Sequence, residues 1–144
     1  MAARFIDTNV FLRHFLADDQ DKAAAAQGVL LRIESGEEQV MTSHLVLFEL
    51  VFILHRTYKL PKDEVVALVA GLLDYRGLQL VGKEIWRTAF DVWTAHTIDF
   101  TDAYNVAVMR ATGVTEIYAW DRGYNQVADI TRIEPGESSE EEAA

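Results

Sequence analysis

The 144-residue sequence contains no cysteine, and this absence narrows the possible chemistry. It excludes a disulfide framework, a thiolate nucleophile and a thiolate metal site. No apolar run reaches the length of a membrane span, because the longest candidate, residues 45–54, is short and contains Glu49. The N-terminus also lacks the basic-then-apolar order of a secretory signal. We therefore expect a globular cytoplasmic protein with no membrane association.

Basic charge is also scarce. Lysine and arginine total 13 against 23 aspartates and glutamates, which gives a formal net charge of −10. This sign argues against nucleic-acid binding through a broad basic surface, although carboxylates that hold divalent cations can reverse the local field. Five of the acids lie in residues 134–144, which we predict to be a disordered tail after one domain at residues 1–133.

Strand-like and helix-like segments alternate along the chain. The pattern predicts a three-layer α/β fold, in which a short parallel sheet of four to five strands has helices on both faces. The expected strands are residues 5–6, 39–42, 78–81, 116–119 and 131–133. The expected helices follow Asp7 and Ser43 and include residues 22–33, 62–75, 83–94 and 101–110. Tryptophan and phenylalanine at helical spacing in residues 83–94 favour a core role over base stacking.

Two acids occur at the ends of predicted strands. Asp7 follows Phe5 and Ile6, and Asp121 follows the strand that ends at Ala119. Open α/β sheets bind ligands at the carboxyl ends of their strands, which makes both acids candidate site residues. The simpler alternatives are that Asp7 is only a helix N-cap and that Asp121 only forms a turn with Gly123.

Three further acids lie at informative positions. Glu49 occurs in an otherwise apolar helix, so we expect it in the core, where a carboxylate must be paired, protonated or bound to metal. A salt bridge with Arg13 is the structural alternative. Asp102 falls in the first turn of a helix that Thr101 is expected to cap, a position that the helix dipole alone can favour. Asp99, just before that helix, is better placed to support a ligand or fix the loop than to be a main ligand.

Asp7, Glu49, Asp102 and Asp121 become more informative as a set. Right-handed crossovers bring strand ends and helix starts to one edge of a parallel sheet. Carboxylates that share a pocket repel one another unless cations are present, and oxygen ligands suit Mg²⁺ or Mn²⁺.

At these residues the chain resembles the PIN-domain ribonucleases, and within them the VapC-like toxins of toxin-antitoxin pairs. The matching segments, in order, are F-I-D-T-N-V-F-L-R at residues 5–13, H-L-V-L-F-E-L-V-F-I-L at 44–54, D-F-T-D-A-Y-N-V-A-V-M at 99–109 and Y-A-W-D-R-G-Y at 118–124.

This resemblance implies specific residue roles. Asp7, Glu49, Asp102 and Asp121 would form the catalytic metal site, and Asn9, Ser43 and Asp99 would support it. The implied activity is Mg²⁺- or Mn²⁺-dependent endonucleolytic cleavage of RNA, with tRNA among the possible substrates. The implied partners are a cognate antitoxin of a type II pair and a second copy of the chain in a homodimer.

Other readings of the sequence stay open. A PIN scaffold without catalysis could serve as an RNA- or protein-binding module. Arg13 and Arg122 could contact the RNA backbone or could be ordinary solvated charges. Residues 52–60 and 62–75 are candidates for the dimer or antitoxin surface because of their amphipathic pattern. A phosphoaspartate receiver is disfavoured, because Asn9 stands where its second motif acid would be.

Overall fold

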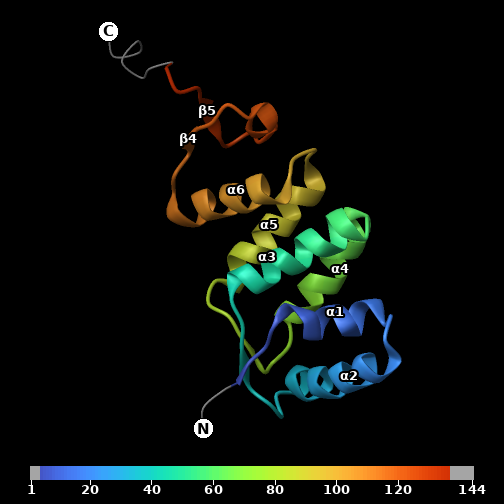
Figure 1. Cartoon of the computed structure of the whole chain (residues 1–144). Helices are drawn as coiled ribbons and strands as arrows, with labels where there is room; N and C mark the ends of the chain where they lie inside the picture. The colour runs from blue at the N-terminus through green and yellow to red at the C-terminus, as the bar shows by residue number, and fades with distance from the viewer. Residues whose placement is uncertain (1–3, 137–144) are drawn as a thin grey trace. The chain divides into compact units, whose positions relative to one another are not determined.

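The computed structural model describes residues 4–136 of the chain (Figure 1). The chain forms two compact units, the first ending at Lys83 and the second beginning at Glu84. Each unit has its own parallel sheet and its own buried core. The predicted α/β class is confirmed, and the described strands are distributed between a three-stranded and a two-stranded sheet.

The first unit alternates short strands with helices. Its elements in chain order are β1 (Arg4–Phe5), α1 (Thr8–Leu16), α2 (Gln20–Ser35), β2 (Val40–Met41), α3 (His44–Phe52), the π-helix η1 (Ile53–Thr57), α4 (Lys62–Leu73) and β3 (Leu78–Gln79).

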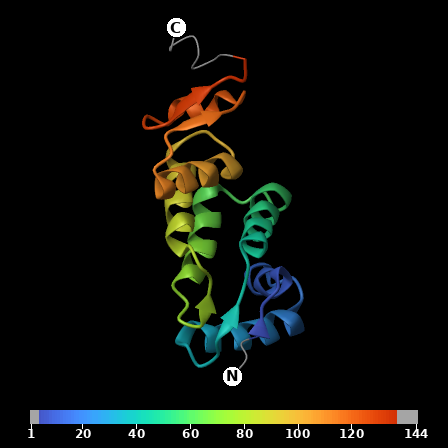
Figure 2. The same cartoon turned by 90° about the vertical axis from the view of Figure 1, so that its left-hand side faces the viewer.

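The sheet of this unit has the order β1-β2-β3, with β2 in the middle and all strands parallel. Val40 pairs with Arg4 on one side and with Leu78 on the other, which fixes the register. Parallel neighbours require crossover connections, and here α1 and α2 form the first while α3, η1 and α4 form the second. Figure 2 shows the strands close to α2.

Local sequence signals explain where the helices begin and end. The side chain of Asp19 accepts a hydrogen bond from the Lys22 backbone N–H at 3.1 Å and so caps α2. Gly36 ends α2 with a φ of 86°, a left-handed conformation that glycine adopts without a Cβ penalty. Ser43 caps α3 as predicted, because its hydroxyl accepts from the Val46 N–H at 3.2 Å.

The core of the first unit is formed mainly by aliphatic side chains from its helices, together with Phe11 of α1. The apolar stripe of α4, including Val65, Val69 and Leu72, is buried inside this core. Val66 and Leu68 of the same helix are only half-buried, and a partner surface at residues 62–75 stays a prediction. Of the two segments predicted as a partner surface, residues 52–60 carry the exposed aromatics Phe52 and Tyr58.

The second unit consists mainly of two helices and a small sheet. Its elements are α5 (Lys83–Ala95), α6 (Phe100–Thr112), β4 (Glu116–Tyr118), the 3₁₀ helix η2 (Arg122–Gln126) and β5 (Thr131–Ile133). β4 and β5 are parallel, with Glu116 opposite Thr131 and Tyr118 opposite Ile133.

Aromatic side chains hold α5 and α6 together. The rings of Trp86 and Phe100 stack with centroids 5.5 Å apart, and Trp93 meets the edge of Phe100 at 5.2 Å. Offset and edge-to-face pairs of this kind add stability beyond the area they bury. The prediction that the tryptophans of residues 83–94 belong to the core is confirmed.

The structure bears on the predicted C-terminal tail and on the predicted lack of a membrane span. The predicted disordered tail begins within the described residues, where Glu134 pairs with Arg132 at 3.1 Å, but from residue 137 onward it lies outside them. Within residues 4–136, no helix combines the length and the apolar character that crossing a membrane would require.

Candidate functional site

Asp7 lies at the junction between β1 and α1. The backbone N–H of Ile6 bonds to Met41 of β2 at 2.9 Å, which ties the residue before Asp7 to the sheet. Asp7 occupies the N-cap position of α1, but its exposed side chain makes no capping hydrogen bond. The structure therefore places this carboxylate just after β1, an edge strand of the three-stranded sheet, and gives it no capping hydrogen bond.

Glu49 lies on α3, and here the sequence interpretation was wrong. We predicted that this acid would be in the core, but it is exposed. The reason is that α3 buries only one face, which includes Leu47, Leu50 and Val51 at 0–2 % exposure. The opposite face carries the exposed side chains of Leu45 and Phe52 one turn on either side of Glu49.

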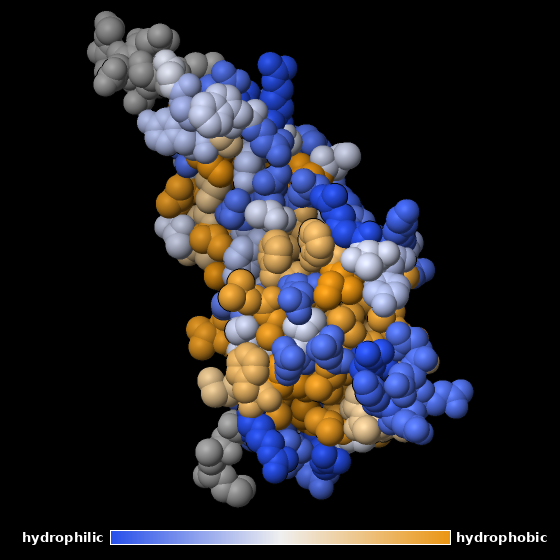
Figure 3. Space-filling model, viewed as in Figure 1, coloured by the Kyte–Doolittle hydropathy of each residue, from blue (hydrophilic) through white to orange (hydrophobic). Residues whose placement is uncertain are grey.

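The molecular surface in the region of α3 is partly apolar. Orange surface is seen in the region of α3 in Figure 3, interrupted by polar groups. The alternative partner for Glu49, Arg13, pairs instead with Asp18 at 3.1 Å. Arg13 therefore forms its salt bridge with Asp18 and not with Glu49.

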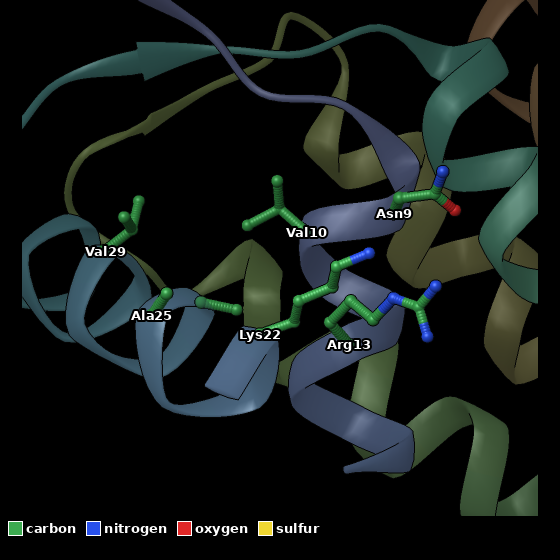
Figure 4. Close-up of a pocket in the computed structure, with 7 residues that line it drawn as sticks. Asn9, Val10, Arg13, Lys22, Ala25 and Val29 are labelled. Atoms are coloured by element: carbon green, nitrogen blue, oxygen red, sulfur yellow. The ribbon is translucent and has the colours of Figure 1, made fainter. Parts of the chain in front are cut away.

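A hollow of about 340 Å³ lies between α1 and α2 in the first unit. Figure 4 shows that Asn9, Arg13 and Lys22 bring nitrogen-bearing side chains to it, whereas Val10, Ala25 and Val29 line its apolar part. Asn9 lies in the first turn of α1, directly after the segment that carries Asp7.

In the second unit, Asp102 of α6 is held by a buried tyrosine. The Tyr124 hydroxyl donates to Oδ1 of Asp102 at 3.0 Å and accepts from the Asn105 amide at 3.0 Å. Tyr124 is only 3 % exposed, so its position is fixed by packing. The sequence predicted Asp102 in the first turn of this helix, but it did not identify Tyr124 as the residue that holds it.

The charge of Asp102 is affected by its surroundings. Burial raises the pKa of its carboxyl above the ordinary 3.8, the Tyr124 hydrogen bond opposes this, and interactions with Asp121 and Asp99 raise it further. Burial also raises the pKa of Tyr124 to about 12, so the hydroxyl keeps its proton at neutral pH and donates it to Asp102.

Asp121 forms the turn that begins η2. Its Oδ1 accepts from the Gly123 N–H at 2.8 Å. A Cβ at position 123 would lie 3.1 Å from that same oxygen and 3.1 Å from Ile98, so the turn fits glycine more closely than any larger residue. The local turn that we weighed as the alternative role of Asp121 is therefore present, and it also holds the carboxylate near enough to Asp102 to influence its pKa.

Asp99, rather than the predicted Thr101, is the N-cap residue of α6, and the helix begins at Phe100. Its side chain makes no capping hydrogen bond, yet its negative charge raises the pKa of Asp102. The second unit thus brings Asp99, Asp102 and Asp121 into one electrostatic neighbourhood.

The predicted acids consequently fall into two sets. Asp7 and Glu49 belong to the first unit, and Asp102 and Asp121 belong to the second. Across residues 4–136, no three acidic or histidine side chains are arranged as a ready metal cage. A common four-acid site stays a prediction.

Comparison with known families places the chain in a class. The family model for the PIN domain matches residues 4–130, so the chain belongs to the PIN domain family. A curated relative is the protein named VapC ribonuclease of Aquifex aeolicus (strain VF5), which is 21 % identical over 136 residues. That alignment covers 94 % of this chain and 99 % of the relative.

Proposed function

We propose that the protein is a metal-dependent endoribonuclease of the VapC kind, with Asp7, Glu49, Asp102 and Asp121 as its metal-binding acids. The observation that carries this proposal is that Asp102 and Asp121 lie close enough to interact, so that Asp121 adds to the rise in the pKa of Asp102 that burial causes. Like charges held together gain most from a bound cation. The family membership and the VapC ribonuclease relative support the same reading.

The donor set fits Mg²⁺ or Mn²⁺. All four side chains offer carboxylate oxygens, which hard divalent cations prefer, and cysteine is absent from the sequence. A bound divalent ion would activate water and neutralise charge that develops on a phosphodiester.

The chain's own residues then have separable tasks. The Tyr124 hydroxyl orients the Asp102 carboxylate through one 3.0 Å hydrogen bond, and Asn105 orients that hydroxyl by donating to it at 3.0 Å. Gly123 fixes Asp121 through its backbone N–H. Ser43 supports Glu49 indirectly, because it caps the helix that carries this acid. Asn9 and Asp99 lie next to Asp7 and Asp102 along the chain and are proposed as further supports.

The finer features of the substrate and partners belong to the same proposal. Arg13 and Arg122 would contact the RNA backbone, with tRNA among the candidate substrates. An antitoxin and a second copy of the chain would be the protein partners. The exposed apolar side chains of Leu45 and Phe52 beside Glu49 favour a contact of this kind, because large exposed apolar groups that cluster mark interaction surfaces.

The test is cleavage of total RNA and purified tRNA in Mg²⁺, in Mn²⁺ and in EDTA. Asp7→Asn and Asp121→Asn should each abolish a discrete metal-dependent cut. Asp21→Asn, an exposed acid in the first turn of α2, should leave cleavage unchanged and serves as the matched control. If no metal supports cleavage and calorimetry detects no Mn²⁺ binding, the acids are structural and the protein is a binding module.

A further inference from the structure

Trp120 differs from the other two tryptophans of the chain. Trp86 and Trp93 are 0 % and 1 % exposed inside the aromatic core of the second unit, whereas Trp120 is 69 % exposed. The indole ring of Trp120, a large and mostly apolar group, is therefore accessible to solvent. Single exposed apolar residues are common on protein surfaces, so the significance of Trp120 depends on its neighbours.

The neighbours of Trp120 make its position informative. It directly precedes Asp121, and Tyr118, two residues earlier at the end of β4, is also 69 % exposed. β4 ends at Tyr118 and the chain bends at Trp120, so both rings belong to the short exposed segment that leads from the strand into Asp121. Arg122, also exposed, follows Asp121 directly. Residues 118–122 thus carry two accessible aromatic rings, one carboxylate and one cation.

This combination matches the chemistry of single-stranded nucleic acid binding. Proteins of that class stack unpaired bases on aromatic side chains and track the backbone with cationic groups. A base inside a duplex has both faces covered by its neighbours, so only an unpaired nucleotide can offer a face to such a ring. The rest of the protein is acidic, with a net charge of −10, so stacking would supply attraction that the overall charge does not.

We propose that Trp120, with Tyr118 two residues before it, is a stacking site for an unpaired base of RNA next to Asp121. This inference deepens the proposed ribonuclease function and rests on it for the identity of the nucleic acid. It assigns to Trp120 a substrate-binding role.

The intrinsic fluorescence of the protein offers a direct test, because Trp120 is the tryptophan exposed to solvent. The protein would carry Asp7→Asn, so that RNA is not cut in Mg²⁺, and would be titrated with a mixed-sequence oligoribonucleotide of about one dozen residues. We expect quenching by the single strand and much weaker quenching by the same strand in a blunt duplex. Equal quenching by both forms would overturn the proposal.

Substitutions make the test specific. In the same background, Trp120→Ala should weaken binding of a fluorescently labelled single strand about tenfold, and Trp120→Phe should restore most of the affinity. Leu31→Ala removes an exposed apolar side chain from α2 in the first unit and should change nothing. Unchanged affinity in a folded Trp120→Ala protein, checked by circular dichroism, refutes the stacking role. A Trp120 signal that follows protein concentration without RNA would also refute it and would indicate a protein contact.

The stacking site and the nuclease can fail separately. Metal-dependent cleavage by the unsubstituted protein, with no quenching of Trp120, would refute only the stacking site. Quenching by single-stranded RNA without cleavage in any metal would leave the stacking site intact and refute the proposed nuclease.

Discussion

The hydroxyl of Tyr124 donates a hydrogen bond to Oδ1 of Asp102 across 3.0 Å, and this joins η2 to the first turn of α6. The two residues are 22 positions apart in the sequence. Because Tyr124 is buried, it limits the orientations that the Asp102 carboxylate can take. A ligand held in advance binds a metal more tightly than one that must be ordered on binding.

Tyr124→Phe removes this restraint while keeping the ring. We expect Mn²⁺ affinity, measured by calorimetry, to fall at least about tenfold, as for other residues that orient metal ligands. The free energy of unfolding should fall by about 1 kcal/mol for the lost hydrogen bond. Tyr118→Phe removes an exposed hydroxyl and is the matched control. Unchanged Mn²⁺ affinity in Tyr124→Phe would mean that the tyrosine contributes only to stability.

The raised pKa of Asp102 predicts a pH dependence of stability in metal-free protein. Between the ordinary value of 3.8 and the higher value in the folded state, the native protein binds more protons than the unfolded chain. Stability should therefore fall as pH rises through that interval and should stay lower above it. Asp102→Asn keeps an acceptor for Tyr124 and removes the charge. We expect it to raise the midpoint of thermal unfolding at neutral pH in EDTA.

Asp129 supplies the control of opposite sign. Its two carboxylate oxygens accept from Arg110 at 2.8 and 2.9 Å, and this hydrogen bonding lowers the pKa of Asp129. The ionised Asp129 therefore stabilises the folded protein above the pKa that it has in the unfolded chain. This stabilisation is lost as the pH falls through the lower pKa of the folded state. Asp129→Asn should therefore lower the unfolding midpoint slightly at neutral pH, because the pair is exposed. Thermal unfolding curves that move in the same direction for both variants would contradict the assignment.

Gly123→Ala should disturb the turn that holds Asp121. Its new Cβ would lie 3.1 Å from both Asp121 Oδ1 and Ile98, so one of them must move. We expect the free energy of unfolding to fall by about 1 kcal/mol or more, together with weaker Mn²⁺ binding. Gly71→Ala is the matched control, because nothing lies within 4 Å of its Cβ position in α4. That variant should be more stable by roughly 0.5–1 kcal/mol in denaturant unfolding. A fully stable Gly123→Ala protein would rule out the steric argument.

Ser43→Ala should weaken the start of α3, because the Ser43 hydroxyl accepts from the Val46 N–H. Loss of an N-cap of this kind costs about 1 kcal/mol, whereas Ser43→Asp retains an acceptor and should be tolerated. Urea unfolding of both variants checks the difference. Equal destabilisation by alanine and aspartate would show that capping is not the role of Ser43.

The sequence predicted those features that depend on local patterns. Strand 131–133, the Ser43 cap and the buried face of α5 were all found where residue patterns placed them. The first strand was predicted at residues 5–6 and lies at Arg4–Phe5, a shift of one residue that is usual for the boundary of an element.

The features that the sequence did not predict depend on tertiary structure. Glu49 was expected in the core because α3 is apolar all round, and such a helix gives no periodic signal for which face is buried. The bond between Tyr124 and Asp102 depends on how η2 lies against α6. The tyrosine in Y-A-W-D-R-G-Y was visible, but nothing local distinguished it from any other buried ring.

The brevity of β1, β2 and β3, each two residues long, has a consequence for the order of folding. A ladder this short provides too few hydrogen bonds to nucleate, and parallel pairing must wait for the intervening helices to close the loops between strands. We expect the helices of the first unit to form early and the strand ladder to form on them. The carboxylate of Asp7, which follows β1, is then set in place by one of the last steps of folding.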